Sequence, residues 1–202
     1  MVVTHQIAGQ GFTHQLLWNS AKTLLSQPGS QTPKDGYFRM AGMLMAYFAF
    51  EAYLNLVGPR VDPGAWKNER DFFNTDPYRG TDGKLKRISE KIGVTLAKGE
   101  RPYQTIRKLK RLRDFLAHGR LESYAYEIEL SGDKTPDMFG GLTIYKWTSA
   151  SEAELALNDT QELIQFLHTN IIKALHIDDL PFPGNPLKFP LAFAEGEEKP
   201  SR

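Results

Sequence analysis

The chain contains no cysteine, and this absence excludes several kinds of protein. Without thiols the chain cannot form a disulfide scaffold, a thiolate zinc site, a cysteine-ligated iron–sulfur cluster or a cysteine nucleophile. An excess of charge of one sign is also missing, because 25 Lys and Arg stand against 24 Asp and Glu, which leaves a net charge of +1. Any binding of nucleic acid must therefore depend on a local basic patch rather than on the overall charge.

Long hydrophobic runs are missing as well. The longest apolar run covers residues 40–50 and lies between Arg39 and Glu51. A membrane-spanning helix needs about 20 apolar residues, so we expect no membrane association. Residues 1–10 lack the basic segment and apolar stretch of a signal peptide, and the 41% hydrophobic and 24% charged residues are typical of a soluble globular protein. We expect a cytoplasmic protein.

No catalytic motif with a known metal or nucleotide chemistry is found in the sequence. There is no HExxH, no cluster of carboxylates at ligand spacing, no P-loop, no complete dinucleotide fingerprint and no G-x-S-x-G. We therefore expect no metal and no cofactor. Four histidines have no acid or ligand partner at a suitable spacing, and we expect them to be surface or packing residues: His5, His14, His168 and His176.

Apolar residues recur at helical spacing along most of the chain, which predicts a mainly all-α, up-and-down bundle of about five helices. Pro28-Gly29 and Gly58-Pro59 are interpreted as the ends of the first two helices. Ser151 with Glu154 is interpreted as the capping box that opens the last helix. The expected helices are residues 12–27, 37–57, a short segment from Asp62-Pro63 to about 73, 84–97, 103–118 and 151–176.

Two segments depart from this helical pattern. Residues 124–130 and 142–147 alternate with a period of two, which predicts a small β-hairpin over about residues 124–147. Residues 177–202 hold five prolines and are predicted to be an extended tail that packs through Phe182, Phe189 and Phe193 and ends in a disordered segment. We therefore expect a helical domain over residues 1–176 followed by this tail.

The segment 101–120 concentrates positive charge, with seven basic residues against the single acid Asp114. Such a patch is suited to the phosphates of a nucleic acid, although basic residues at the end of a helix are also commonly just solvated. At about 100° per residue, Arg107, Arg111 and His118 share the polar face of the predicted helix with Asp114. Lys110 and Arg120 add to the patch.

Arg113 lies instead at the edge of the apolar stripe of the same helix, where a guanidinium needs an acidic partner. Glu51 is a suitable candidate, because it interrupts an otherwise apolar helix one turn before the polar Asn55. The sequence predicts that Glu51, with Asn55 beside it, meets Arg113 inside the bundle.

Residues 113–118, RDFLAH, resemble the R-x4-H motif of HEPN domains, with a polar residue after the Arg and a small residue before the His. Residues 49–55, AFEAYLN, are similar to the second helix of several HEPN families. The resemblance covers residues 12–176 as architecture, so the domain over residues 1–176 is interpreted as HEPN-like. The hairpin and tail lie outside the common HEPN core.

The resemblance implies metal-independent cleavage of RNA at a site composed of two motifs that face each other across a homodimer. His118 would be the acid/base, Arg113 would hold the scissile phosphate, and Asp114 would orient or tune them. The 2′-hydroxyl of the RNA would attack and leave a cyclic phosphate. Such a ribonuclease is expected to act as a toxin or defence protein, neutralised by an antitoxin or another protein partner.

Two alternatives remain open at the level of sequence. One is a catalytically inactive HEPN-like module that binds RNA, a nucleotide or a partner protein. The other is a helical interaction protein in which R-x4-H is a coincidence. The last alternative predicts that Arg113 is held in a buried ion pair and that His118 faces solvent without a cleft.

Overall fold

The structure is a computed structural model that describes residues 12–26, 33–119, 121–125, 127, 141–176 and 184–188. These residues form eight helices, rather than the expected number of about five, and no strand, so the expected all-α class is confirmed but its helix count is not. The helices are α1 (Thr13–Leu25), α2 (Pro33–Val61), α3 (Pro63–Lys67), α4 (Glu69–Phe72), α5 (Gly80–Lys91), α6 (Tyr103–His118), α7 (Thr143–Trp147) and α8 (Ala150–Leu175).

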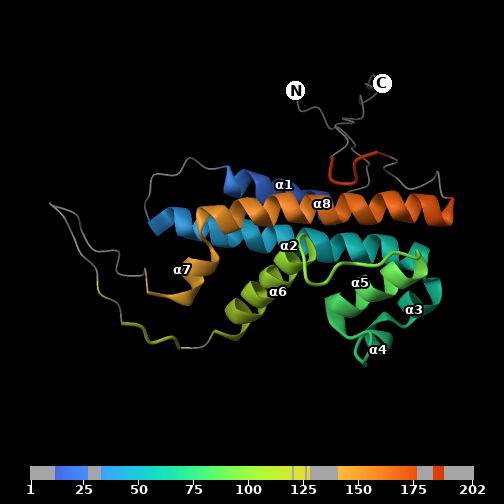
Figure 1. The fold of residues 1–202 in the computed structure, drawn as a ribbon, viewed down its shortest axis with the longest axis horizontal. Helices are drawn as coiled ribbons and strands as arrows, with labels where there is room; N and C mark the ends of the chain where they lie inside the picture. Colours follow the sequence, from blue (N-terminus) through green and yellow to red (C-terminus); the bar gives the residue numbers. More distant parts are fainter. Residues whose placement is uncertain are drawn as a thin grey trace, which may run out of the picture.

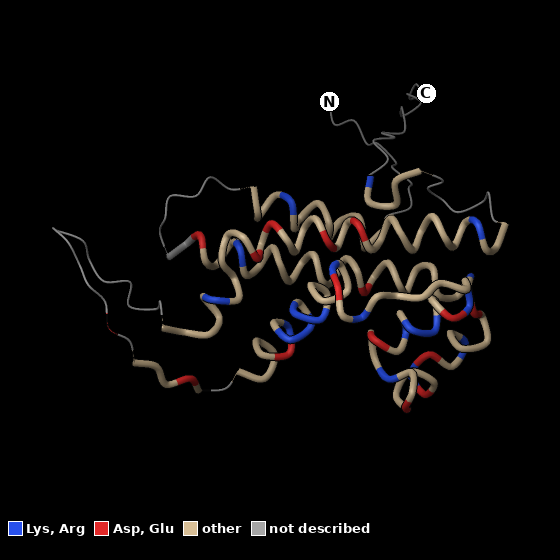
Figure 2. Tube along the Cα trace, in the orientation of Figure 1, with Lys and Arg blue, Asp and Glu red and all other residues tan. Residues whose placement is uncertain are grey.

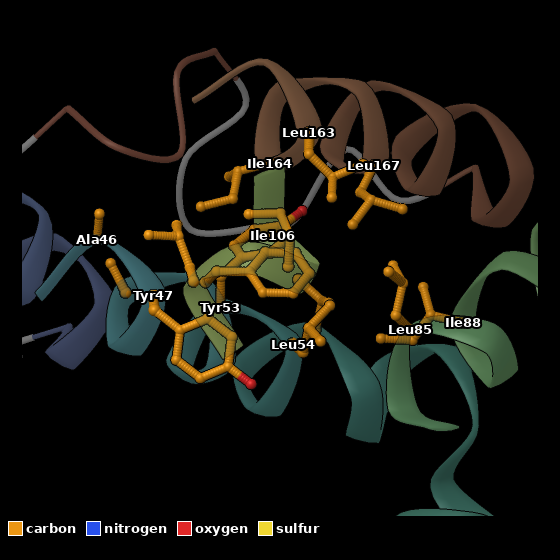
Figure 3. Packing of buried hydrophobic residues seen from close by; sticks show 14 of the residues in the cluster. Ala46, Tyr47, Tyr53, Leu54, Leu85, Ile88, Ile106, Leu163, Ile164 and Leu167 are labelled. Carbon is orange, nitrogen blue, oxygen red and sulfur yellow. The ribbon is translucent and has the colours of Figure 1, made fainter. Parts of the chain in front are cut away.

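Helix α2 is the central element of the fold. It packs along α1 and α8, while α6 crosses it and α3 and α5 contact its C-terminal half (Figure 1). Its aromatic residues Tyr47, Phe50 and Tyr53 are fully buried and belong to the same core cluster as Leu163 and Leu167 of α8, and Figure 3 shows this packing between α2 and α8. The apolar sequence of α2 is therefore used mainly for packing within the chain.

The same helix passes a simple test for a membrane span. Among the described residues, Asp35–Val61 is the one helical stretch that is long and apolar enough to cross a membrane by length and composition. Half of its most apolar window is buried inside the protein. A core helix of a soluble protein has the same two properties, and the packing of α2 is compatible with a soluble protein.

The predicted end of this second helix is wrong, because α2 continues through Gly58-Pro59 to Val61. The Asp62 amide donates to the Gly58 carbonyl at 2.9 Å, which carries the helical hydrogen bonding past the proline. Gly58 serves packing rather than termination: a Cβ at this position would lie 2.0 Å from the Trp66 indole of α3. The helix also begins earlier than predicted, at Pro33.

The second half of the predicted hairpin is also wrong, because Thr143–Trp147 forms the short helix α7. In helical geometry Ile144 and Trp147 share one face; Ile144 packs against the core and Trp147 contacts Phe115 of α6. Glu122 accepts the Thr143 amide at 2.6 Å at the start of α7. Residues 121–125 have no regular structure, and 126 and 128–140 lie outside the described residues.

The remaining helices occur where the sequence predicts them, and all but α6 differ from the prediction at their ends. Helix α6 has the predicted bounds and ends at Gly119, whose left-handed φ of 45° suits a residue without a side chain. Helix α8 is capped by the Ser149 hydroxyl on the Glu152 amide, rather than by Ser151. Helix α5 covers residues 80–91 instead of 84–97, and the short segment after Asp62 divides into α3 and α4.

Part of the tail packs on the bundle at residues 184–188. Pro186 and Leu187 are buried there, and Gln15 of α1 donates to the Pro186 and Lys188 carbonyls at 3.1 Å each. Of the histidines expected to be surface or packing residues, His14 is buried in this contact and His168 in the core, while His176 is exposed. The phenylalanines at 182, 189 and 193, the C-terminal residues 191–202 and His5 lie outside the described residues.

Candidate nucleic-acid interface on helix α6

Helix α6 presents one face to the core and the other to solvent. Ile106, Leu109 and Leu112 are almost completely buried, which fixes the rotation of the helix against α2 and α8. Its exposed cations Arg107, Lys108 and Arg111, and His118, consequently lie on its outer side, and Lys and Arg positions are concentrated along this helix (Figure 2). The amphipathic pattern of the sequence therefore places the basic patch as expected.

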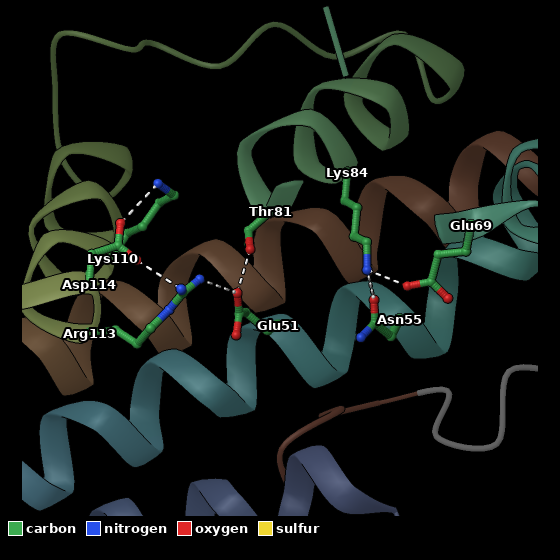
Figure 4. Close-up of polar contacts among 8 residues, drawn as sticks. All are labelled: Glu51, Asn55, Glu69, Thr81, Lys84, Lys110, Arg113 and Asp114. Carbon is green, nitrogen blue, oxygen red and sulfur yellow. Dashed lines mark hydrogen bonds and ion pairs between the residues drawn. The ribbon is translucent and has the colours of Figure 1, made fainter. Parts of the chain in front are cut away.

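Arg113 contacts Glu51, the partner that the sequence indicates. Arg113 Nη2 lies 3.4 Å from Glu51 Oε1, and Arg113 Nη1 lies 2.8 Å from Asp114 Oδ1 (Figure 4). Its guanidinium carbon is also 5.7 Å from the centre of the Tyr47 ring. Burial acts to lower the pKa of Arg113, but Tyr47, Glu51 and Asp114 outweigh it and raise the pKa. The guanidinium is half-buried, charged and held in place by α2 and by its own helix.

Two residues of the polar group around Arg113 and Glu51 could not be predicted from the sequence. Thr81, at the start of α5, donates a hydrogen bond to the Glu51 carboxylate, and Tyr47 lies buried beside Arg113. Burial raises the pKa of Tyr47, so its hydroxyl stays protonated. Nothing in the spacing of Tyr47 or Thr81 indicates a polar role, because one lies in an apolar run and the other in a loop-like segment.

Asn55 does not join Arg113 in the structure. Its side-chain oxygen accepts from Lys84 Nζ at 2.7 Å, and Lys84 also forms an ion pair with Glu69 (Figure 4). One helical turn separates Glu51 from Asn55, so the two residues face different neighbours on α5. The acidic partners of Arg113 are therefore Glu51 and Asp114, and Asn55 does not contact it.

His118 lies on another side of the helix. Because α6 is helical throughout residues 103–118, five residues rotate the His118 side chain about 140° away from Arg113. His118 is exposed, and no described residue forms a hydrogen bond or ion pair with it. Within one chain, the described structure does not bring the two motif residues to one pocket.

The basic residues of α6 divide into compensated and uncompensated cations. Lys108 binds Glu152 of α8 at 2.9 Å, and Lys110 binds Asp114 at 3.3 Å. Arg107 and Arg111 are exposed and form no ion pair with a described residue. These two arginines and His118 fall on one face of α6, within about 40° of rotation. Arg120 lies outside the described residues.

No group of three or more His, Asp or Glu side chains among the described residues could hold a metal ion. The groups that α6 presents to a ligand are its cations, the imidazole of His118 and the group of Arg113. The two arginines can bind a phosphate, and an imidazole beside them can exchange a proton with a hydroxyl group of the bound strand.

The comparisons with protein-family models, with curated proteins and with solved structures found no match to the chain.

Proposed function

We propose that the protein is a metal-independent endoribonuclease of the HEPN type, acting at a site composed across a homodimer in the cytoplasm. The support is the exposed face of α6, where the uncompensated Arg107 and Arg111 accompany His118. Two arginines without acidic partners can bind successive phosphates of RNA. His118 then lies beside the bound strand, at the end of the helix.

The divergence of Arg113 and His118 determines how the site is assembled. About 140° of rotation on a continuous helix keeps one chain from offering both residues to one phosphate. In a two-fold symmetric dimer, His118 of one chain meets Arg113 of the other, and the same site forms twice. Glu51 and Asp114 position Arg113 for this role.

The proposed reaction is a transesterification within the RNA strand. A basic imidazole removes the proton of a 2′-hydroxyl, and the freed oxygen attacks the adjacent phosphorus. The bond from phosphorus to the 5′-oxygen of the next nucleotide breaks, and that oxygen takes up the proton that the imidazolium now carries. The products are a 2′,3′-cyclic phosphate and a 5′-hydroxyl end. Arg113 stabilises the additional negative charge on the phosphoryl oxygens.

The direct test is cleavage of a structured RNA by the full chain in EDTA. We expect the wild type to cleave and to leave cyclic phosphate ends, and His118→Ala and Arg113→Ala each to lose at least about 100-fold in rate. His176→Ala is the matched control, because His176 is an exposed histidine at the end of another helix. Cleavage by both motif variants at the wild-type rate would reject the proposal.

Mixing the two inactive variants tests the dimeric site. A heterodimer of His118→Ala and Arg113→Ala chains retains one complete site, made of His118 from one chain and Arg113 from the other. After subunit exchange we expect about a quarter of the wild-type rate, because half of the dimers are mixed and each has one of its two sites intact. No recovery in demonstrably mixed dimers would reject the composite site.

A second candidate function is supported by the partners of Arg113. Two carboxylates, Glu51 and Asp114, already compensate this cation, which weakens its attraction for a phosphate. This ion pair, together with the exposed His118, is the arrangement that a helical interaction protein with a coincidental R-x4-H predicts, and it is also compatible with a catalytically inactive HEPN-like module that binds RNA, a nucleotide or a partner protein through Arg107 and Arg111. RNA binding without cleavage by a folded dimer would decide for this candidate. A toxin role would add a neutralising protein partner, detectable as an inhibitor of the cleavage.

A further inference from the structure

A cavity of about 160 Å³ lies beside the basic face of α6, between α2, α6, α7 and the start of α8. Its apolar surface comes from Met43, Leu109 and Leu112, all nearly buried, and one side is the Trp147 indole of α7. Pockets for drug-sized ligands measure about 300–1,000 Å³, so this cavity suits a group the size of one heterocyclic ring system.

Trp147 presents a fixed aromatic surface to this cavity. Its ring meets the Phe115 ring at 5.4 Å between centroids with an interplanar angle of 69°, which holds the indole against α6. Trp147 is 37% exposed, whereas Trp18 and Trp66 are 3% and 8% exposed. A partly open indole beside an apolar surface is suited to stacking on a planar ring.

The charges around the cavity favour an anion. Lys108, Arg111 and Lys146 line it with a single carboxylate, Glu152. Glu152 is bound to Lys108 at 2.9 and 3.1 Å, so these two charges compensate each other. Arg111 and Lys146 form no ion pair with a described residue, and Lys146 interacts with the Glu122 carboxylate only beyond ion-pair distance, so two cations remain at the rim.

We infer that this cavity binds a single nucleotide, with the base against Trp147 and the phosphate between Arg111 and Lys146. The bound group is a nucleotide in both of the cases that the test separates, a free nucleoside monophosphate and one residue of an RNA strand. Arg111 connects the cavity to the proposed cleavage site, since His118 follows it by about 10 Å along the helix axis, the length of about three stacked nucleotides. The RNA source rests on the proposed function, whereas binding of a free nucleotide does not.

The test measures binding of AMP, GMP, CMP and UMP to the full chain by calorimetry and tryptophan fluorescence. Ribose 5-phosphate serves as the ligand without a base. We expect the nucleotides to bind at least about 10-fold more tightly than ribose 5-phosphate and to quench the fluorescence through Trp147, the exposed indole. Equal affinity for ribose 5-phosphate, or no binding of any nucleotide, would overturn the inference.

Variants identify the residues that make the contact. Arg111→Ala and Lys146→Ala should each weaken nucleotide binding about 10-fold or more, and Trp147→Ala about 5- to 150-fold. If Trp147→Ala unfolds α7, the Arg111→Ala and Lys146→Ala variants still test the inference. Lys22→Ala is the matched control, because Lys22 is an exposed cation on α1, away from the cavity. An equal loss in Lys22→Ala would overturn the assignment.

The source of the nucleotide is decided with the His118→Ala protein, which leaves the cavity intact. A short single-stranded RNA that binds more than about 10-fold tighter than the monophosphates indicates a residue of a strand, and equal or weaker binding indicates a free nucleotide. Nucleotide binding without any cleavage by the wild type rejects the proposed function and retains this inference. Cleavage that persists while every nucleotide fails to bind rejects the inference alone.

Discussion

His14 is a buried histidine whose surroundings oppose its protonation. Its Nε2 lies 2.8 Å from the Pro186 carbonyl oxygen, and its ring packs edge-on against Tyr53, which contacts His168 through an oxygen–nitrogen distance of 3.2 Å. Burial lowers the pKa of His14 and is the largest effect; the contact with the Pro186 carbonyl raises the pKa by less, and the nearby His168 lowers it by a smaller amount still. The imidazole is therefore neutral in the folded protein at neutral pH.

We expect the stability of the protein to fall as the pH falls below about 6.5. The folded pKa of His14 lies below its ordinary value of 6.5, so the unfolded chain binds the proton first. The stabilising contribution is complete above pH 6.5 and is lost as the pH falls from there through the folded pKa, by at most about 1.4 kcal/mol per pH unit for one proton. Urea unfolding between pH 8 and 5 measures this slope.

His14→Gln removes the titrating group, so the decline of the unfolding free energy with falling pH should become shallower. His118→Ala changes an exposed histidine and should show the same decline as the wild type. Loss of the decline in His118→Ala, or an equal slope in His14→Gln, would contradict the assignment.

The carboxylates of Asp62 and Asp159 contribute to stability in a separate range of pH. Burial acts to raise the pKa of Asp62 and Asp159, but their arginine partners hold both values below the ordinary 3.8, so their contribution is lost only under more acidic conditions.

At the residue scale, the sequence predicts polar pairs where a charge interrupts an apolar pattern. Glu51 and Arg113 could be paired because each lies on a helix side that is otherwise buried, and a guanidinium there needs an acid. Asn55 carries no net charge, so nothing in its spacing distinguishes Lys84 from Arg113 as its partner. Tyr47 gives no polar signal at all, since an aromatic residue in an apolar run is typical of any core.

At the scale of elements, the prediction succeeds where several local signals agree. Helix α6 has an apolar stripe, a basic last turn and Gly119 after it, and its bounds are as predicted. The predicted end of α2 depended on the Gly58-Pro59 signal alone. In the structure, the packing of Gly58 against Trp66 outweighs that local signal. Helix α7 has only five residues, too few to separate a period of two from a helical period.

Gly58 provides a test of how α2 and α3 approach each other. Alanine normally stabilises a helix relative to glycine by up to about 1 kcal/mol. At position 58 its Cβ would lie 2.0 Å from the Trp66 indole, so we expect Gly58→Ala to reduce the unfolding free energy by about 1–3 kcal/mol. Denaturant unfolding measures the change.

Gly64→Ala, in the adjacent helix α3, is the matched control, because the nearest atom to its added Cβ is 3.6 Å away. We expect this variant to change the unfolding free energy by less than about 0.5 kcal/mol. A stabilised Gly58→Ala protein would show that Trp66 does not pack against this turn of α2.

At the scale of the whole molecule, segments from the two ends of the sequence meet. Residues 184–188 lie on α1, where the buried Gln15 binds two of their carbonyls, and α1 in turn packs on α2 and α8. The sequence could not predict this contact, because a proline-rich segment has no periodicity that indicates its partner. The Pro-rich composition predicts an extended chain, and the buried Pro186 and Leu187 show that this part of it packs against the core.

Leu187 and Leu121 offer a comparison of the same substitution in two environments. Leu187 is 3% exposed against the bundle, whereas Leu121 is 96% exposed just after α6. We expect Leu187→Ala to lower the unfolding free energy by about 2–3 kcal/mol and Leu121→Ala to change it by less than about 0.5 kcal/mol. Thermal and denaturant unfolding of the full chain measure both. Equal stability of the two variants would mean that residues 184–188 contribute nothing to the fold, and the buried contacts of His14 and Gln15 would then need another explanation.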